Sequence, residues 1–89
     1  MVSTQITIIN KLGLHARAAA KLVSTAAAYG STVKIGYPNR MVDAKSIMAV
    51  MMLAASKGTD IQIEAEGNDA QPALDALCEL INRRFDEGE

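Results

Sequence analysis

The residues best suited to chemistry lie between Asn10 and Arg17, in the stretch Asn-Lys-Leu-Gly-Leu-His-Ala-Arg. The only histidine of the chain, His15, stands there, where an alanine-rich segment typical of a helix begins. The free N–H groups and the dipole of a helix start favour a phosphate. An imidazole that titrates near neutrality is a nucleophile, and a guanidinium can bind phosphate oxygens. His15, Arg17 and the backbone amides of Ala16 and Arg17 therefore predict a covalent phosphohistidine site.

A simpler interpretation also exists for each of these residues. A lone histidine beside a helix start is more often a surface or capping residue, and most arginines are solvated. The combination with Gly13 favours the chemical interpretation, because glycine permits the unusual backbone of an anion-binding turn.

Composition limits what the chain can be. With 89 residues, 49% of them hydrophobic, we expect one folded domain over residues 1–89. With a net charge of −1, the chain does not attract the phosphate backbone of nucleic acids at long range, so no nucleic-acid partner is expected. With three aromatic residues, we expect no deep pocket for a bulky cofactor and no cofactor.

The sulfur chemistry and the termini are equally restrictive. Cys78 is the single cysteine, which excludes an internal disulfide, and one thiol with one histidine cannot make a structural zinc site. No signal segment or membrane-spanning stretch is visible, which favours a cytoplasmic protein without membrane insertion.

The elements that must position His15 follow from periodicity. Alternating residues predict strands over 4–9, 31–36, 41–43 and 60–66, and helices are expected over 16–28, over 46–55 and from about residue 70. The first helix should bury one stripe of small side chains, namely Ala16, Ala19, Ala20, Val23 and Ala27, and the third a stripe that continues to Phe85. The acidic residues 86–89 oppose the helix dipole and are expected to fray. These patterns predict an α+β, two-layer open-faced sandwich: a four-stranded antiparallel sheet with three helices on one face.

A second informative stretch runs from Lys45 to Leu53 and is rich in Ile, Val and Met. A helix of about ten residues cannot bury all of these side chains in a two-layer fold, so part of it should be an exposed, adaptable contact surface. A fully buried core helix is an equally good interpretation of the pattern alone. Ser46 is expected to be the N-cap of this helix.

The two motifs together resemble the histidine-containing phosphocarrier (HPr) family of the bacterial phosphotransferase system. The resemblance rests on Gly-Leu-His-Ala-Arg before an alanine-rich helix and on Lys-Ser-Ile-Met at the start of the next helix, and it covers essentially the whole chain. One departure is Ala18, where the family usually has proline; alanine is compatible with a helix start.

The resemblance implies a function. His15 would accept a phosphoryl group from enzyme I and donate it to a sugar-specific or nitrogen-related enzyme IIA, with Arg17 steadying the phosphate. The protein would be a stoichiometric carrier, not an enzyme, and is expected to be a monomer. Ser46 corresponds to the serine that, in many relatives, an ATP-dependent HPr kinase/phosphatase modifies. An apolar docking surface of Ala20, Ile47, Met48, Met51 and Met52 would exclude water during transfer.

Two other classes remain open. A small hydrolase resembling acylphosphatases shares the open-faced plan, but Asn10 and Arg17 are a poor substitute for its arginine loop and asparagine. A regulatory or ligand-binding α+β module would leave His15 without a chemical role.

Overall fold

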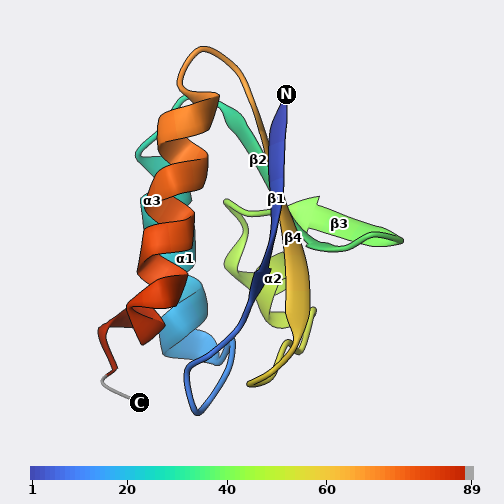
Figure 1. Ribbon diagram of the computed structural model, residues 1–89, viewed down its shortest axis with the longest axis vertical. Helices are drawn as coiled ribbons and strands as arrows, with labels where there is room; N and C mark the ends of the chain where they lie inside the picture. The colour runs from blue at the N-terminus through green and yellow to red at the C-terminus, as the bar shows by residue number, and fades with distance from the viewer. Residues whose placement is uncertain (88–89) are drawn as a thin grey trace.

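The computed structural model describes residues 1–87 and contains one four-stranded sheet and three α-helices (Figure 1). A short 3-10 turn follows the last helix. In chain order the elements are β1 (Val2–Thr7), α1 (Ala16–Ala27), β2 (Thr32–Tyr37), β3 (Arg40–Asp43), α2 (Ile47–Met51), β4 (Asp60–Glu66), α3 (Ala70–Asn82) and η1 (Arg84–Asp86).

The strands are antiparallel and lie in the order β1-β4-β2-β3. β4 occupies the centre, with Ile63 opposite Thr4 on one side and Ile35 on the other. Ile61, Ile63 and Ala65 are buried, whereas the side chains that alternate with them point away from the core. This pattern confirms the predicted strand over 60–66 and the α+β open-faced architecture.

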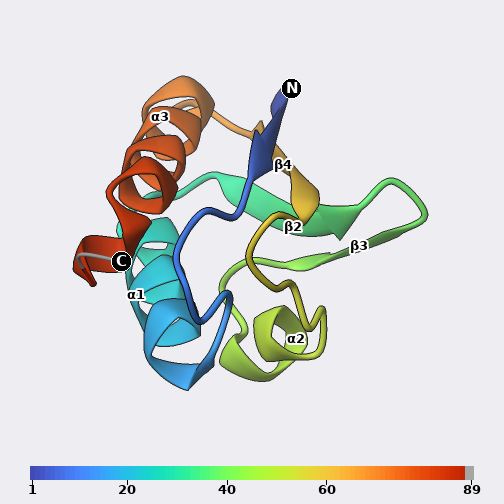
Figure 2. The same cartoon turned by 60° about the horizontal axis from the view of Figure 1, so that its bottom comes forward.

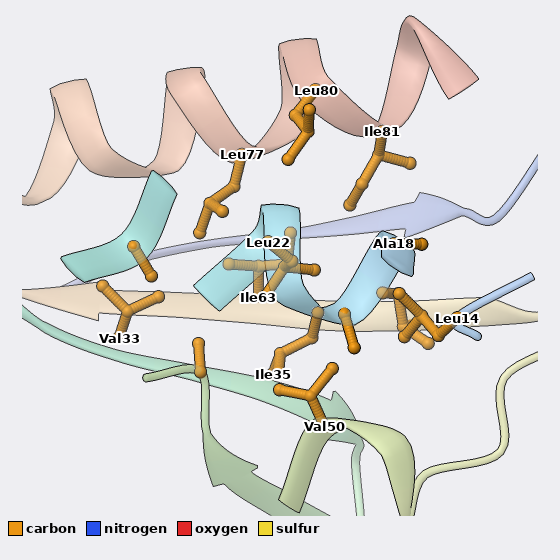
Figure 3. Packing of buried hydrophobic residues seen from close by; sticks show 14 of the residues in the cluster. Leu14, Ala18, Leu22, Val33, Ile35, Val50, Ile63, Leu77, Leu80 and Ile81 are labelled. Carbon is orange, nitrogen blue, oxygen red and sulfur yellow. The ribbon is translucent and has the colours of Figure 1, made fainter. Parts of the chain in front are cut away.

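The helices cover the buried face of the sheet, with α1 and α3 side by side (Figures 1 and 2). Figure 3 shows how Leu77 and Ile81 of α3 meet Leu22 of α1 above Ile63 and Val33 of the sheet. A single cluster of buried hydrophobic side chains results. None of the helices in residues 1–87 has the length and apolarity needed to cross a membrane.

The predicted buried stripe of α1 was right for Ala19 but displaced by about one position elsewhere. The buried residues are Ala18, Ala19, Leu22 and Ala26, whereas Ala16 and Ala27 are exposed. Ala20 and Val23, also predicted to face inward, are half-buried. Leu22 is the largest side chain of the buried set, and burying it orients the helix.

Some element ends also differ from the sequence prediction. β1 ends before Ile8, although Ile8 remains buried and exchanges backbone hydrogen bonds with the 58–59 segment. α2 is only five residues long, since Ala54 has a positive φ and the following carbonyl of Ala55 accepts the Leu14 amide at 2.8 Å. The backbone there is committed to tertiary hydrogen bonds instead of continuing the helix.

Candidate functional site

The loop before α1 is held in one shape by a glycine and a buried amide. Gly13 has φ +68°, and a Cβ there would lie 2.5 Å from the Ala55 carbonyl oxygen. Asn10 is fully buried, and its Nδ2 donates to the Gly13 carbonyl at 2.8 Å. Leu14 is buried as well. These contacts fix the backbone that delivers His15 to the start of α1.

His15 is the N-cap of α1, in agreement with its predicted place at the helix start. Its backbone is extended, with φ −74° and ψ 177°, and its carbonyl accepts the Ala19 amide at 2.8 Å. Its Nδ1 accepts the amide N–H of Arg17 at 3.3 Å. The His15 side chain is 28% exposed. Nδ1 therefore lies beside the first amides of the helix, where an anion is favoured.

The other ring nitrogen of His15 has a partner that the sequence prediction missed. Nε2 lies within hydrogen-bond distance of Oε2 of Glu87, whose side chain is only 15% exposed. Oε1 of the same carboxylate accepts Nδ2 of Asn10 at 3.0 Å. The expectation that residues 86–89 fray is thus wrong for Asp86 and Glu87; residues 88–89 lie outside the described part of the chain.

A tight turn brings Glu87 back to the histidine. Arg84, Phe85 and Asp86 all have positive φ, so the chain leaves the α-helical path after α3. Phe85 does not continue the stripe of α3 as predicted, but its ring is fully buried, and Lys21 Nζ donates to its carbonyl at 2.7 Å. We call Arg84–Glu87 the post-helix turn. Two features of the sequence could have indicated this turn: a large apolar residue, Phe85, beyond the end of the helix, and a polar residue, Asn10, in a hydrophobic segment.

The environment of Glu87 favours its charged form. Burial of the carboxylate disfavours ionisation, but hydrogen bonds from Asn10 and His15 and the positive charges of His15 and Lys21 outweigh it. The pKa of Glu87 is consequently lowered from its ordinary value.

Basic and acidic side chains line a hollow beside His15. A hollow of about 330 Å³ is lined by Lys11, Leu12, His15, Arg17, Lys21, Asp86 and Glu87. The side chain of Arg17 is exposed there. Within residues 1–87, no cluster of three His, Cys, Asp or Glu side chains could hold a metal ion. The arrangement offers a nucleophilic nitrogen, helix amides and basic side chains to a phosphoryl group.

The second motif forms a separate exposed surface on α2. Ser46 is the N-cap and accepts the Ala49 amide at 3.4 Å. Met48 and Met52 are 70% and 62% exposed, and the other exposed members of this surface are Ile47 and Met51. Ala20 of α1 is half-buried. Figure 2 shows α2 beside α1, against which it packs. Leu12, 66% exposed in the hollow, is an apolar residue that the sequence prediction did not include.

Comparison with known proteins assigns the chain to a family. Residues 2–83 match a family model described as the PTS HPr component phosphorylation site. Phosphocarrier protein HPr of Pseudomonas aeruginosa is 61% identical over the full length of both chains. Phosphocarrier protein NPr of Shewanella violacea is 42% identical over 93% of this chain and 91% of its own. The crystal structure of HPr-C-His from Thermoanaerobacter tengcongensis is 44% identical, superposes with a TM-score of 0.94 and covers 98% of both chains. The resemblance in the two motifs is thereby confirmed, and the chain belongs to the HPr phosphocarrier family of the phosphotransferase system.

Proposed function

We propose that His15 is the residue that carries the phosphoryl group, accepting it from enzyme I through Nδ1 and donating it to an enzyme IIA. The observation that supports this assignment is the contact between Nδ1 and the Arg17 amide at the open start of α1. A phosphoryl group on Nδ1 would replace this contact, and its oxygens would accept hydrogen bonds from the backbone amides of Ala16 and Arg17. The guanidinium of Arg17 would steady the transferring charge.

The site suits a carrier better than a hydrolase. A carrier must hold its cargo loosely enough to give it up, and a partly exposed imidazole in an open hollow meets that requirement. The chain acts as a stoichiometric carrier in which positioning and electrostatics do most of the work during transfer. It needs no cofactor for this role.

The partner surface consists of Ala20 with the exposed apolar residues of α2: Ile47, Met48, Met51 and Met52. Flexible methionines adapt to more than one partner, which fits a protein that must dock first on enzyme I and then on an enzyme IIA. Higher identity to a protein named HPr than to one named NPr favours the HPr branch. We infer that the single domain, residues 1–89, acts as a cytoplasmic monomer; light scattering at working concentration tests the oligomeric state.

Ser46 is the proposed regulatory site, modified by an HPr kinase/phosphatase. A phosphate there would add about −2 charge beside the methionine surface and weaken docking. Incorporation of acid-stable label from ATP with a matching kinase, absent in Ser46→Ala, tests this role. Incorporation that is unchanged in Ser46→Ala would assign the modification to another residue.

The carrier function is tested by incubating the protein with enzyme I and labelled phosphoenolpyruvate. Acid-labile label is expected in the wild type and absent in His15→Ala. Label that persists in His15→Ala would move the phosphorylated position elsewhere. A wild type that takes up no label would favour the regulatory-module alternative.

A further inference from the structure

We propose that Glu87 is a positioning residue for phosphoryl transfer: its carboxylate keeps the proton of His15 on Nε2, so that Nδ1 remains both the nucleophile and the leaving nitrogen. The inference rests on the proposed role of His15 and adds a residue far from the family's histidine motif. It starts from the contacts that the two ring nitrogens make.

The two contacts of the imidazole select the same tautomer. A neutral imidazole has one nitrogen that donates and one that accepts. The amide of Arg17 can only donate, so Nδ1 must accept. An ionised carboxylate can only accept, so Nε2 must carry the proton that it gives to Glu87. Because neither partner can exchange its role, the lone pair of His15 is directed toward the start of α1.

The carboxylate is itself held in place. Asn10 Nδ2 donates to both the Gly13 carbonyl and Oε1 of Glu87, so the loop that delivers His15 also orients Glu87. Phe85 anchors the turn from the other side, since its ring is fully buried and its carbonyl accepts Lys21 Nζ. Such an arrangement resembles the way a carboxylate orients a catalytic histidine through its second nitrogen. The lowered pKa of Glu87 agrees with an ionised acceptor.

This proton placement has a consequence at each stage of transfer. When the Nδ1 lone pair attacks phosphorus, the bond from phosphorus to the donor breaks and the donor keeps that electron pair. His15 becomes an N-phosphorylated imidazolium whose Nε2 proton remains in place. Glu87 stabilises the new positive charge. On donation, the lone pair of the acceptor's nucleophile forms a bond to phosphorus and the phosphorus–Nδ1 bond breaks. The electron pair of that bond returns to Nδ1, and neutral imidazole leaves without losing its Nε2 proton.

Loss of the carboxylate should therefore impair donation. If Nε2 lost its proton, the leaving group would be an imidazolate, which leaves far less readily than neutral imidazole. Glu87 thus helps to keep the phosphoryl group transferable. An alternative is that the negative charge repels incoming phosphate and acts as a gate, in which case its removal would speed acceptance.

Glu87→Gln tests the proposal because the geometry dictates how the new amide must sit. Asn10 still donates toward Oε1, so the amide NH₂ of the glutamine would face Nε2 and present a donor where the wild type has an acceptor. The matched control is Glu79→Gln, which removes a carboxylate on α3 that is 72% exposed, is paired with Arg83 and is not hydrogen-bonded to the imidazole.

The first readout uses the unphosphorylated protein, so it is independent of enzyme I. Nitrogen-15 NMR of neutral His15 should show protonated Nε2 in the wild type and in Glu79→Gln. In Glu87→Gln, a substantial population protonated on Nδ1 should appear. Identical imidazole spectra in all three proteins would overturn the proposal.

The second readout is transfer from the phosphorylated proteins to an enzyme IIA. We expect Glu87→Gln to donate about fivefold more slowly, equivalent to about 1 kcal/mol for a partly exposed charged hydrogen bond, and Glu79→Gln to match the wild type. Unchanged donation would also count against a positioning role, and faster acceptance from enzyme I would establish a gate in its place. If the wild type takes up no phosphate at all, the carrier function fails while the NMR result still decides where the proton resides.

Discussion

Replacing Phe85 with alanine should release the post-helix turn and free His15 from Glu87. The ring of Phe85 is fully buried, yet φ is 57°, 53° and 61° at Arg84, Phe85 and Asp86. A left-handed backbone costs a residue other than glycine roughly 1–2 kcal/mol, so the three together store about 3–6 kcal/mol. Truncating a buried phenylalanine to alanine costs roughly 3–5 kcal/mol, which is a similar amount. Burial of this one ring is therefore large enough to offset the strain of the turn.

Without the ring, detachment of the turn relieves the strain. Part of the lost burial energy is returned, so we expect the free energy of unfolding to fall by only about 1–3 kcal/mol. Leu77→Ala is the matched control. Leu77 is also fully buried, but it lies in the middle of α3 and has no strained segment to release. It should show the full cost of a core truncation, roughly 2–5 kcal/mol.

Urea unfolding followed by circular dichroism measures both changes, and nitrogen-15 NMR of His15 reports whether Glu87 has left. In Phe85→Ala, the preference for a proton on Nε2 should weaken, and adding Glu87→Gln should change the spectrum no further. The reasoning is refuted if Phe85→Ala costs as much as Leu77→Ala and His15 keeps the wild-type spectrum. That result would mean that contacts other than the ring hold the turn.

Arg17→Ala should slow phosphoryl transfer but change the free energy of unfolding by no more than about 0.5 kcal/mol, because the side chain is exposed; a larger loss in urea unfolding would make Arg17 structural. Gly13→Ala should destabilise the protein by about 2 kcal/mol or more in the same assay, since φ is +68° and a Cβ would meet the Ala55 carbonyl at 2.5 Å. Gly58→Ala, with φ +89° and open space around it, should cost only about 1 kcal/mol, and equal losses would contradict the role of the close contact. Stability should also fall as the pH drops below the ordinary carboxylate value of 4.5, because the lowered pKa of Glu87 leaves the unfolded chain with more bound protons than the folded one. Glu87→Gln should make that loss shallower in acid titrations followed by circular dichroism.

The parts of the fold predicted from sequence are those in which one local pattern has one physical solution. Residues 60–66 alternate strictly between aliphatic and polar side chains, and only a strand with one wet face satisfies that pattern. The start of α1 was equally clear, because a glycine, a histidine and an alanine run change the backbone preference within a few residues. Ser46 is an N-cap, as expected, and His15 caps the helix whose start was predicted beside it.

The local sequence pattern gave wrong predictions in two places. In α1, alanine did not determine which face of the helix is buried, and in α2, tertiary hydrogen bonds ended the helix early. Small side chains lie on every side of α1, so the burial of Leu22, not periodicity, selects the inward face. α2 ends early because other segments use the carbonyls that follow it: Tyr37 Oη donates to Leu53 at 2.8 Å, and the Leu14 amide donates to Ala55. Neither contact has a signature within the helix itself.

The largest omission, Glu87, shows why a site can depend on residues that no motif contains. Its position relative to His15 follows from three successive residues with left-handed backbone, a conformation that is sterically unfavourable for residues other than glycine. Phe85 is fully buried in this turn, and a buried Asn10 supplies a donor that the Glu87 carboxylate satisfies. Each of these features is unfavourable when only neighbouring residues along the chain are considered, so local sequence patterns do not predict it. The same contacts direct the lone pair of His15 toward α1. If His15 carries the phosphoryl group as proposed, the strain in the post-helix turn is part of how the imidazole is positioned for transfer.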